Sequence, residues 1–268
     1  MNITKTLKIS VVGIGGGGCN TISHIANKDF NQALLIAMNT DINVLNITNS
    51  TKKIQLGKIT TKGLGAGMNP SIAKRSAIES YEEIKQSLKD SDIVFIVSAF
   101  GGGTGSGASP LVAKACKEID AIVISLITMP FTWEGKKREK FSKLYIEEMK
   151  THSDALIVVS TDKLLEIISE NVNMKRAFKL IDDILFQTIK SLIDKIILLN
   201  NNTNTIATIL KQKLFILNHK NCTLGVSLAC NSLNRITDLE NIHINFDEKD
   251  LTITATDSPF TNKLLDWV

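Results

Sequence analysis

Near-continuous apolar runs recur along the first two-thirds of the chain, and stretches with helical spacing lie between them. The runs cover residues 8–14, 33–39, 92–100, 121–128 and 155–160. Unbroken runs of this length are typical of strands covered on both faces, as in a parallel sheet. Because the expected strands alternate with helices, the pattern predicts a doubly wound α/β domain.

Two segments carry a clear helical pattern. The first, at residues 69–90, begins with Asn69 as N-cap and Pro70 at the first helical position. Its expected apolar stripe consists of Ile72, Ala73, Ile78, Tyr81, Ile84 and Leu88. The second, at residues 174–199, predicts one long helix with apolar residues at three- and four-residue spacing, namely Ala177, Phe178, Ile181, Leu185, Ile189, Leu192 and Ile196.

An uncharged stretch, LNNNTNTIATIL at residues 199–210, follows the long helix. After it we expect a short helix and three strand-like pieces at 223–230, 242–246 and 251–256, the last two joined as a hairpin. The chain therefore divides into an α/β domain at 1–173, a central helix with its connecting loop at 174–202, and a smaller α+β domain at 203–268.

Charge and composition exclude several classes of protein. The net charge of the 268 residues is +4, with acids and bases mixed, so nothing argues for a nucleic-acid partner. Four scattered cysteines without a CxxC pair indicate free thiols in a reducing compartment, and four histidines show no metal spacing. The N-terminal apolar run is too short for a membrane span and lacks a secretory cleavage pattern. We expect a cytoplasmic protein with no metal site of its own and no direct membrane insertion.

Three glycine-rich segments lie where helices are expected to begin. The first glycine loop, GIGGGGCN at residues 13–20, fits GxGxxG and is followed by Asp41 at the distance found in dinucleotide sites. Alone, this loop could equally be a tight strand–helix turn. The middle glycine loop, GLGAGMNP, occupies residues 63–70, and the last glycine loop, GGGTGSG, occupies residues 101–107 and adds the hydroxyls of Thr104 and Ser106.

Together the three loops predict a nucleoside triphosphate as the ligand. Glycine lets backbone N–H groups approach phosphates closely, and helix N-termini attract anions. No GxxxxGK[ST] motif occurs, so this is not a P-loop protein.

These motifs resemble those of bacterial FtsZ, the tubulin-like division GTPase. GGGTGSG looks like the signature loop of the tubulin/FtsZ superfamily, and the other family motifs occur in family order: GIGGGGCN, NTD (39–41), QLGKITTKGLGAGMNP (55–70), PFTWEGKKR (130–138) and DKLLE (162–166). The resemblance covers about residues 8–200. It implies a GTP-binding domain, a long central helix, a second domain that is reduced here, GTP or GDP with Mg²⁺ held through the phosphates, and head-to-tail protofilaments.

The resemblance also assigns residues to the site. The first phosphate contacts match Gly16, Gly17, Gly18, Cys19 and Asn20, followed by Asn39 and Asp41. The loop that senses the γ-phosphate matches Ala66 and Gly67, and the loop around the β- and γ-phosphates matches Gly102, Gly103, Thr104, Gly105, Ser106 and Gly107. Glu134 and Arg138 match ribose and phosphate contacts, although such a pair is more often a simple surface ion pair.

Guanine recognition is implied for two residues of the long helix. Phe178 matches the ring that stacks on guanine, and Asp182 matches the carboxylate that pairs with guanine N–H groups. Their i, i+4 spacing places both on one helix face. Taken alone, Phe178 would more often be a core residue.

The chain departs from the FtsZ pattern in several loops. Thr161 replaces the usual Asn before DKLL, while Cys19 and Met68 stand where small or polar residues are more common. In FtsZ the loop after the central helix carries N-x-D-x-x-D, whose acids position the attacking water in the next subunit's site. These positions fall on Thr203, Thr205 and Thr208 here, and no Asp or Glu occurs between Asp194 and Asp238. Threonine cannot serve as the base, so we expect weak assembly-stimulated GTP hydrolysis, and enzyme activity itself stays open.

Three functions remain possible at this stage. The first is an FtsZ-like GTP-binding protein that self-associates into filaments or co-assembles with another FtsZ in cell division. The second is a non-polymerising regulator that caps or modulates an FtsZ filament. The third, an NAD(P)-dependent oxidoreductase that uses GIGGGG, is disfavoured by the three-loop arrangement. The apolar residues at 264–268 are expected to pack onto the second domain.

Overall fold

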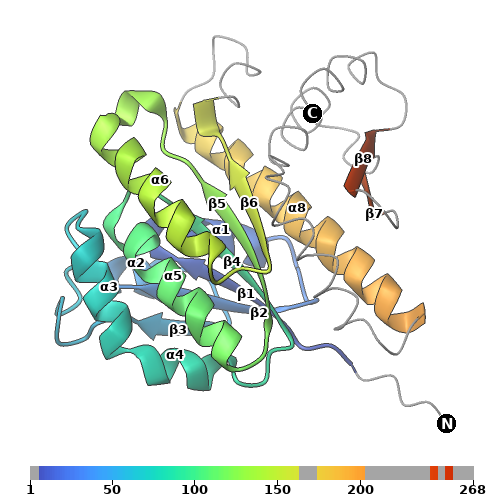
Figure 1. Ribbon diagram of the computed structural model, residues 1–268, viewed down its shortest axis with the longest axis horizontal. Helices are drawn as coiled ribbons and strands as arrows, with labels where there is room; N and C mark the ends of the chain where they lie inside the picture. The colour runs from blue at the N-terminus through green and yellow to red at the C-terminus, as the bar shows by residue number, and fades with distance from the viewer. Residues whose placement is uncertain (1–5, 163–173, 203–241, 247–250, 256–268) are drawn as a thin grey trace.

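A six-stranded parallel sheet forms the centre of the molecule (Figure 1). The structure is a computed structural model that describes residues 6–162, 174–202, 242–246 and 251–255. The strands are β1 (Ile9–Ile14), β2 (Leu34–Asn39), β3 (Lys52–Gln55), β4 (Ile93–Ala99), β5 (Ile122–Thr128) and β6 (Ala155–Val159). Their order across the sheet is β3-β2-β1-β4-β5-β6, which confirms the doubly wound α/β prediction.

Helices cover both faces of this sheet. They are α1 (Gly15–Ala26), α2 (Ile42–Ile47), α3 (Pro70–Glu79), α4 (Tyr81–Leu88), α5 (Gly103–Glu118), α6 (Lys136–Lys150) and α8 (Met174–Asn202), with a 3₁₀ turn η1 at Thr132–Glu134. Helices α1 and α8 pack on one face, and α4, α5 and α6 pack on the other. Successive strand residues point to opposite faces, so each strand contributes to two cores.

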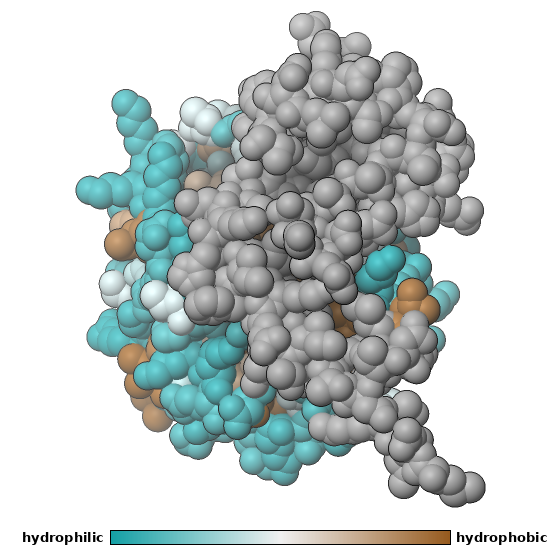
Figure 2. Space-filling view, turned by 45° about the vertical axis from the view of Figure 1, so that its right-hand side comes forward, coloured by the Kyte–Doolittle hydropathy of each residue, from teal (hydrophilic) through white to brown (hydrophobic). Residues whose placement is uncertain are grey.

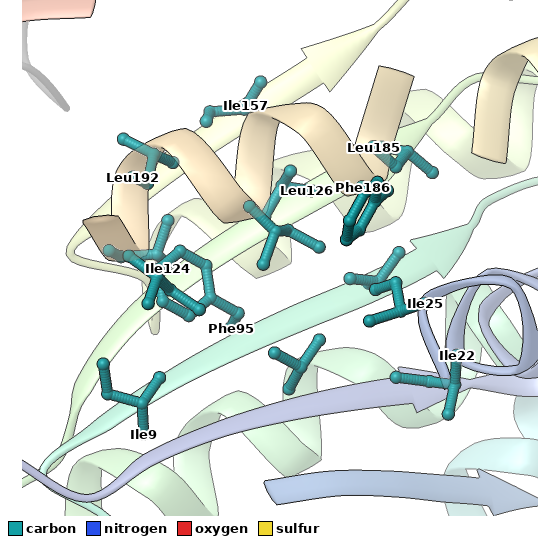
Figure 3. Close-up of a cluster of buried hydrophobic side chains, with 14 of the residues drawn as sticks. Ile9, Ile22, Ile25, Phe95, Ile124, Leu126, Ile157, Leu185, Phe186 and Leu192 are labelled. Atoms are coloured by element: carbon teal, nitrogen blue, oxygen red, sulfur yellow. The ribbon is translucent and has the colours of Figure 1, made fainter. Parts of the chain in front are cut away.

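The core between the sheet and α8 is built from large aliphatic and aromatic side chains (Figure 3). Leu185, Phe186 and Leu192 of α8 lie over the strands, opposite Phe95 of β4 and Leu126 of β5. All seven positions of the stripe predicted for the long helix lie within α8, and all but Phe178 are buried. Helix α8 is therefore an integral layer of the described fold.

The helix predicted over residues 69–90 is in fact two helices. Asn69 caps α3 as expected, because its side chain accepts the backbone N–H of Ser71 at 2.9 Å. The helical path breaks at Ser80, whose hydroxyl accepts the backbone N–H of Gly57 at 2.9 Å. The predicted stripe was wrong at Ile78, which is 58% exposed. Strand β3 was also missed by the sequence pattern.

The predicted hairpin is present as β7 (Ile242–Phe246) and β8 (Leu251–Ala255), paired antiparallel. Residues 203–241 lie outside the described residues, and with them the expected short helix and the piece at 223–230. The same holds for residues 256–268, so the three-part domain division stays a prediction.

Cys19 and Cys116 are buried free thiols, and burial raises the pKa of Cys116 to about 12.

In the view of Figure 2, the described residues that can be seen are mostly hydrophilic, and the visible apolar side chains form small separate groups. Within the described ranges, no helix is long and apolar enough to cross a membrane. The cluster of basic residues at the start of α6 is largely exposed, as expected for a solvated helix face.

Candidate functional site

The three glycine loops meet at the carboxyl-terminal edge of the sheet. The first glycine loop follows β1 and the last follows β4, and these two strands are hydrogen-bonded neighbours. The chain order reverses between them, since β1 continues to β2 on one side while β4 continues to β5 on the other. Open α/β sheets bind ligands in the crevice at such a switch point. The topology alone therefore directs attention to this edge.

The helices that begin here suit an anion. Neither the residue before α1 nor the residue before α5 caps its helix with a side-chain hydrogen bond. The first turns of α1, α3 and α5 contain no acidic residue. Unpaired N–H groups and the helix dipole make such N-termini favourable for phosphate.

Several glycines let the loops touch one another. A Cβ on Gly15, which has a φ of 75°, would lie 2.9 Å from the backbone N of Gly105. A Cβ on Gly103 would lie 2.8 Å from the backbone N of Asn69 and 3.1 Å from Cβ of Ala66. These approaches bring all three glycine loops into direct contact.

Other glycines face open space. No atom lies within 4 Å of the position that a Cβ would take on Gly16, Gly67 or Gly102, one from each loop. Gly16, Asn20 and Gly67 are exposed, and Gly102 and Thr104 are half-buried. The three loops thus each leave room beside one glycine, and contact with a nucleotide stays a prediction for each residue.

Hydroxyl and amide groups at the end of β2 join this framework. The Thr40 and Thr104 hydroxyl oxygens lie 2.7 Å apart and share a hydrogen bond. Asp41 caps α2, because its Oδ1 accepts the backbone N–H of Asn43 at 2.9 Å and of Val44 at 3.2 Å. Asn39 is buried and accepts the N–H of Asp41 through Oδ1.

Three of the predicted site residues point their side chains into the protein or pack within it through their backbone. Cys19 is 1% exposed and lies against Ala37 and Leu45, so only its backbone remains for the site. The Ser106 hydroxyl accepts the N–H of Gly101 at 2.9 Å inside the last glycine loop. Gly107 packs against the backbone of Pro70.

Glu134 and Arg138 border the same edge beyond β5. Arg138 Nη1 forms an ion pair with Glu134 Oε2, and Arg138 Nη2 lies 3.6 Å from Met68 Sδ of the middle glycine loop. Glu134 Oε1 also accepts the N–H of Phe131 at 3.0 Å. The Arg138 side chain is 33% exposed, so it is accessible to a further anionic partner.

An aromatic group lies at the N-terminal end of α8. The Phe178 ring is 46% exposed and meets Phe131 edge-on at 5.7 Å, while Trp133 stacks on Phe131 at 5.3 Å. An exposed ring at a ligand edge suits base stacking. Thr161, expected to replace a base-contacting Asn, is buried and donates to the carbonyl of Met129 at 2.9 Å.

Asp182 lies one helical turn after Phe178. Its Oδ1 accepts the hydroxyl of Thr21 at 2.6 Å. Burial raises the pKa of this carboxyl group, and the Thr21 bond partly opposes that rise. Thr21 and Thr40 are the two site residues that the sequence reasoning missed. Neither gave a signal, since each is an ordinary threonine until its distant partner is known.

The predicted loop positions Thr203, Thr205 and Thr208 lie outside the described residues. Among the residues that are described, no group of three or more His, Cys, Asp or Glu side chains is arranged to hold a metal ion.

Comparison with known proteins gives a consistent set of relatives. The model of the tubulin/FtsZ family GTPase domain matches residues 8–169. Cell division protein FtsZ 1 of Methanocaldococcus jannaschii is 45% identical over 189 residues, which are 70% of this chain and 52% of that protein. The chain thus spans about half the length of this relative.

Solved structures agree with this match. An empty FtsZ dimer from M. jannaschii superposes with a TM-score of 0.68 and 44% identity, over 72% of this chain and 56% of that chain. A GTPgS-bound protofilament of CetZ2 from Haloferax volcanii gives a TM-score of 0.63 at 22% identity, over 70% and 58% of the two chains, and shows likeness of fold alone.

Proposed function

Because the chain belongs to the tubulin/FtsZ family of GTPases, we propose that it binds GTP and GDP at the three-loop edge and assembles head to tail into protofilaments, with weak assembly-stimulated hydrolysis. The uncapped N-termini of α1 and α5, which meet at the switch point of the sheet, carry this proposal. They offer free backbone N–H groups where a phosphate chain needs them.

The phosphates would lie against the open glycines. Gly16, Gly67 and Gly102 leave space on all three loops, and the Thr104 hydroxyl is held at the rim by Thr40. The partly exposed Arg138 adds a positive charge that can approach a phosphate or ribose. Mg²⁺ bound through the phosphates would neutralise charge there, as phosphoryl transfer requires.

The base would lie between Phe178 and Asp182. The half-exposed ring offers a stacking surface, and a carboxylate accepts both the N1–H and the 2-amino group of guanine. Adenine presents no N–H at position 1, so this arrangement favours GTP over ATP. Both residues lie on α8, which the sheet core holds rigidly in place.

Self-association is supported by the relatives. The M. jannaschii FtsZ structure is a dimer, and the H. volcanii CetZ2 structure is a protofilament. Extending this property to the present chain, or to co-assembly with a second FtsZ, is part of the proposal. A role in cell division is proposed on the basis of the same relationship.

Weak hydrolysis is proposed from the sequence after α8. Carboxylates can orient an attacking water, whereas Thr203, Thr205 and Thr208 carry no charge. No acid occurs between Asp194 and Asp238, so a shift in alignment would not supply one.

The test is GTP turnover measured against protein concentration. The wild-type chain should bind GTP yet show slow turnover that hardly rises with concentration, and a Thr205→Asp, Thr208→Asp variant should gain turnover that rises with concentration. Robust turnover by the wild type that increases with its concentration contradicts the hydrolysis part of the proposal. Failure to bind GTP at all contradicts its first part.

A capping regulator is the second candidate, because a chain with a complete nucleotide edge and an altered opposite loop could join only one end of a filament. Negative-stain microscopy of the isolated protein with GTP separates the two. Filaments formed by the chain alone exclude strict capping.

A further inference from the structure

Thr21 connects the first glycine loop to the base end of the site. It lies on α1, directly after the last residue of that loop, and is 2% exposed. Its hydroxyl oxygen lies 2.6 Å from Asp182 Oδ1 and 3.2 Å from the carbonyl oxygen of Gly17. A hydroxyl has one hydrogen to donate, and the shorter contact is the one to the carboxylate.

We propose that Thr21 is a positioning residue for guanine specificity: its hydroxyl orients the Asp182 carboxylate and favours its charged form, so that this group can accept two N–H groups of the base. The inference rests on the proposed function, since it assumes that a guanine nucleotide binds at this edge. Oδ2 of Asp182 takes no part in the Thr21 bond, which leaves it available to the base.

The charge state of Asp182 matters because only the ionised carboxylate accepts hydrogen bonds through both oxygens without donating one. Burial raises its pKa, the Thr21 bond and the nearby His24 lower it, and the neighbouring Asp183 raises it. His24 and Lys28 on α1 face Asp183, at 2.7 and 3.6 Å from its Oδ1. Among Thr21, His24, Lys28 and Asp183, Thr21 is thus the uncharged residue that bonds Asp182 directly.

The direction of the pH effect follows. Removing the hydroxyl takes away a bond that favours the charged carboxylate, so the pKa of Asp182 rises further. The carboxylate then takes up a proton at a higher pH than in the wild type. Affinity for GTP should therefore fall as the pH is lowered. In a variant without the Thr21 hydroxyl, this fall should begin at a higher pH than in the wild type. The difference between the pH profiles of the two proteins is the quantity to measure.

A second buried threonine supplies a matched control. Thr188 is 3% exposed on α8, and its hydroxyl donates to the carbonyl of Ile184 at 2.8 Å. Buried helix threonines commonly bond the carbonyl four residues back, and Thr188 does only that among the contacts described. Thr21→Val and Thr188→Val remove the same group, but only the first removes a bond to Asp182.

The experiment measures the affinity of the full chain for GTP, inosine triphosphate and ATP between acid and mildly alkaline pH. Inosine triphosphate lacks the 2-amino group, and ATP lacks the N1–H. Thr21→Val should lower GTP affinity about tenfold, or about 1.4 kcal/mol, with a larger loss at acid pH and little change for ATP. Thr21→Ser should restore both the affinity and the pH profile, and Thr188→Val should match the wild type.

A double-mutant cycle separates positioning from a structural effect. On an Asp182→Asn background, Thr21→Val should cause no further loss of GTP preference. Equal losses for GTP and ATP at every pH, or a GTP profile of Thr21→Val equal to that of the wild type, overturn the inference. If Thr21→Val does not fold, Thr21→Ala, which removes the hydroxyl without adding volume, is judged by the same criteria. A wild type that does not prefer GTP refutes the proposed function instead.

Discussion

At the residue scale, glycine has two tasks in the site. At Gly105, the missing Cβ allows the last glycine loop to pack against β4, since an added Cβ would lie 2.3 Å from the carbonyl oxygen of Ala99. At Gly102, an added Cβ would meet no atom within 4 Å, and its φ of −88° suits any residue. Gly105 is therefore required for packing, whereas Gly102 borders open space, which we propose the phosphates occupy.

This difference gives a paired prediction. Gly105→Ala should destabilise the fold by about 1–3 kcal/mol or more, because the added methyl group meets backbone that cannot move easily. Gly102→Ala should leave stability within about 0.5 kcal/mol of the wild type but weaken GTP binding at least about tenfold. Thermal unfolding and nucleotide titration of both variants measure the two effects. Normal GTP affinity of Gly102→Ala would mean that this residue does not face the phosphates.

At the element scale, the sequence predicted five of the six sheet strands because each is a continuous apolar run. Edge strand β6 is buried on one face and partly buried on the other. Strand β3 was not predicted because it has the sequence KKIQ, in which only Ile54 is buried. It lies at the edge of the sheet, where a strand needs few apolar residues. The break between α3 and α4 at Ser80 was not predicted because it depends on a hydrogen bond to Gly57, which lies far away in the sequence.

The candidate site was predictable to the extent that it consists of local motifs. The three glycine loops and Asn69 are read from neighbouring residues, and the structure brings the loops together. The bonds from Thr21 to Asp182 and from Thr40 to Thr104 join residues separated by 161 and 64 positions. No local pattern contains such a pair, so only the folded arrangement reveals these two threonines.

The prediction at the element scale concerns how much helix α8 stabilises the sheet domain. Ile189 is fully buried in the core between α8 and the sheet, and Leu198 on the same helix is 54% exposed. Ile189→Ala should therefore lower the free energy of unfolding by about 2–5 kcal/mol, whereas Leu198→Ala should change it by no more than about 0.5 kcal/mol. Denaturant unfolding of the two variants tests this. Equal, small effects would show that α8 does not stabilise the sheet domain.

At the scale of the whole molecule, α8 carries a candidate base-binding residue near its start and extends far beyond it. Asp182 lies near its first turns, and the helix continues to Asn202. With a rise of 1.5 Å per residue, the end of the helix lies about 30 Å from Asp182. Asn202, the last residue of α8, is thus too far from Asp182 to contact a nucleotide bound beside that carboxylate. Under the proposed head-to-tail assembly, the site that this end of the helix would approach belongs to another subunit.

The final prediction concerns filament lifetime. We assume that assembly depends on bound GTP and that hydrolysis is slow because Thr203, Thr205 and Thr208 replace the loop acids. Wild-type filaments should then persist long after assembly, because little GDP accumulates to weaken contacts between subunits. A Thr205→Asp, Thr208→Asp variant should form filaments that disassemble sooner at the same GTP concentration. Light scattering after a limited addition of GTP follows the lifetime, and negative-stain microscopy confirms that filaments cause the signal. Equal lifetimes for the two proteins, with turnover raised in the variant, would show that disassembly is not governed by hydrolysis in this chain.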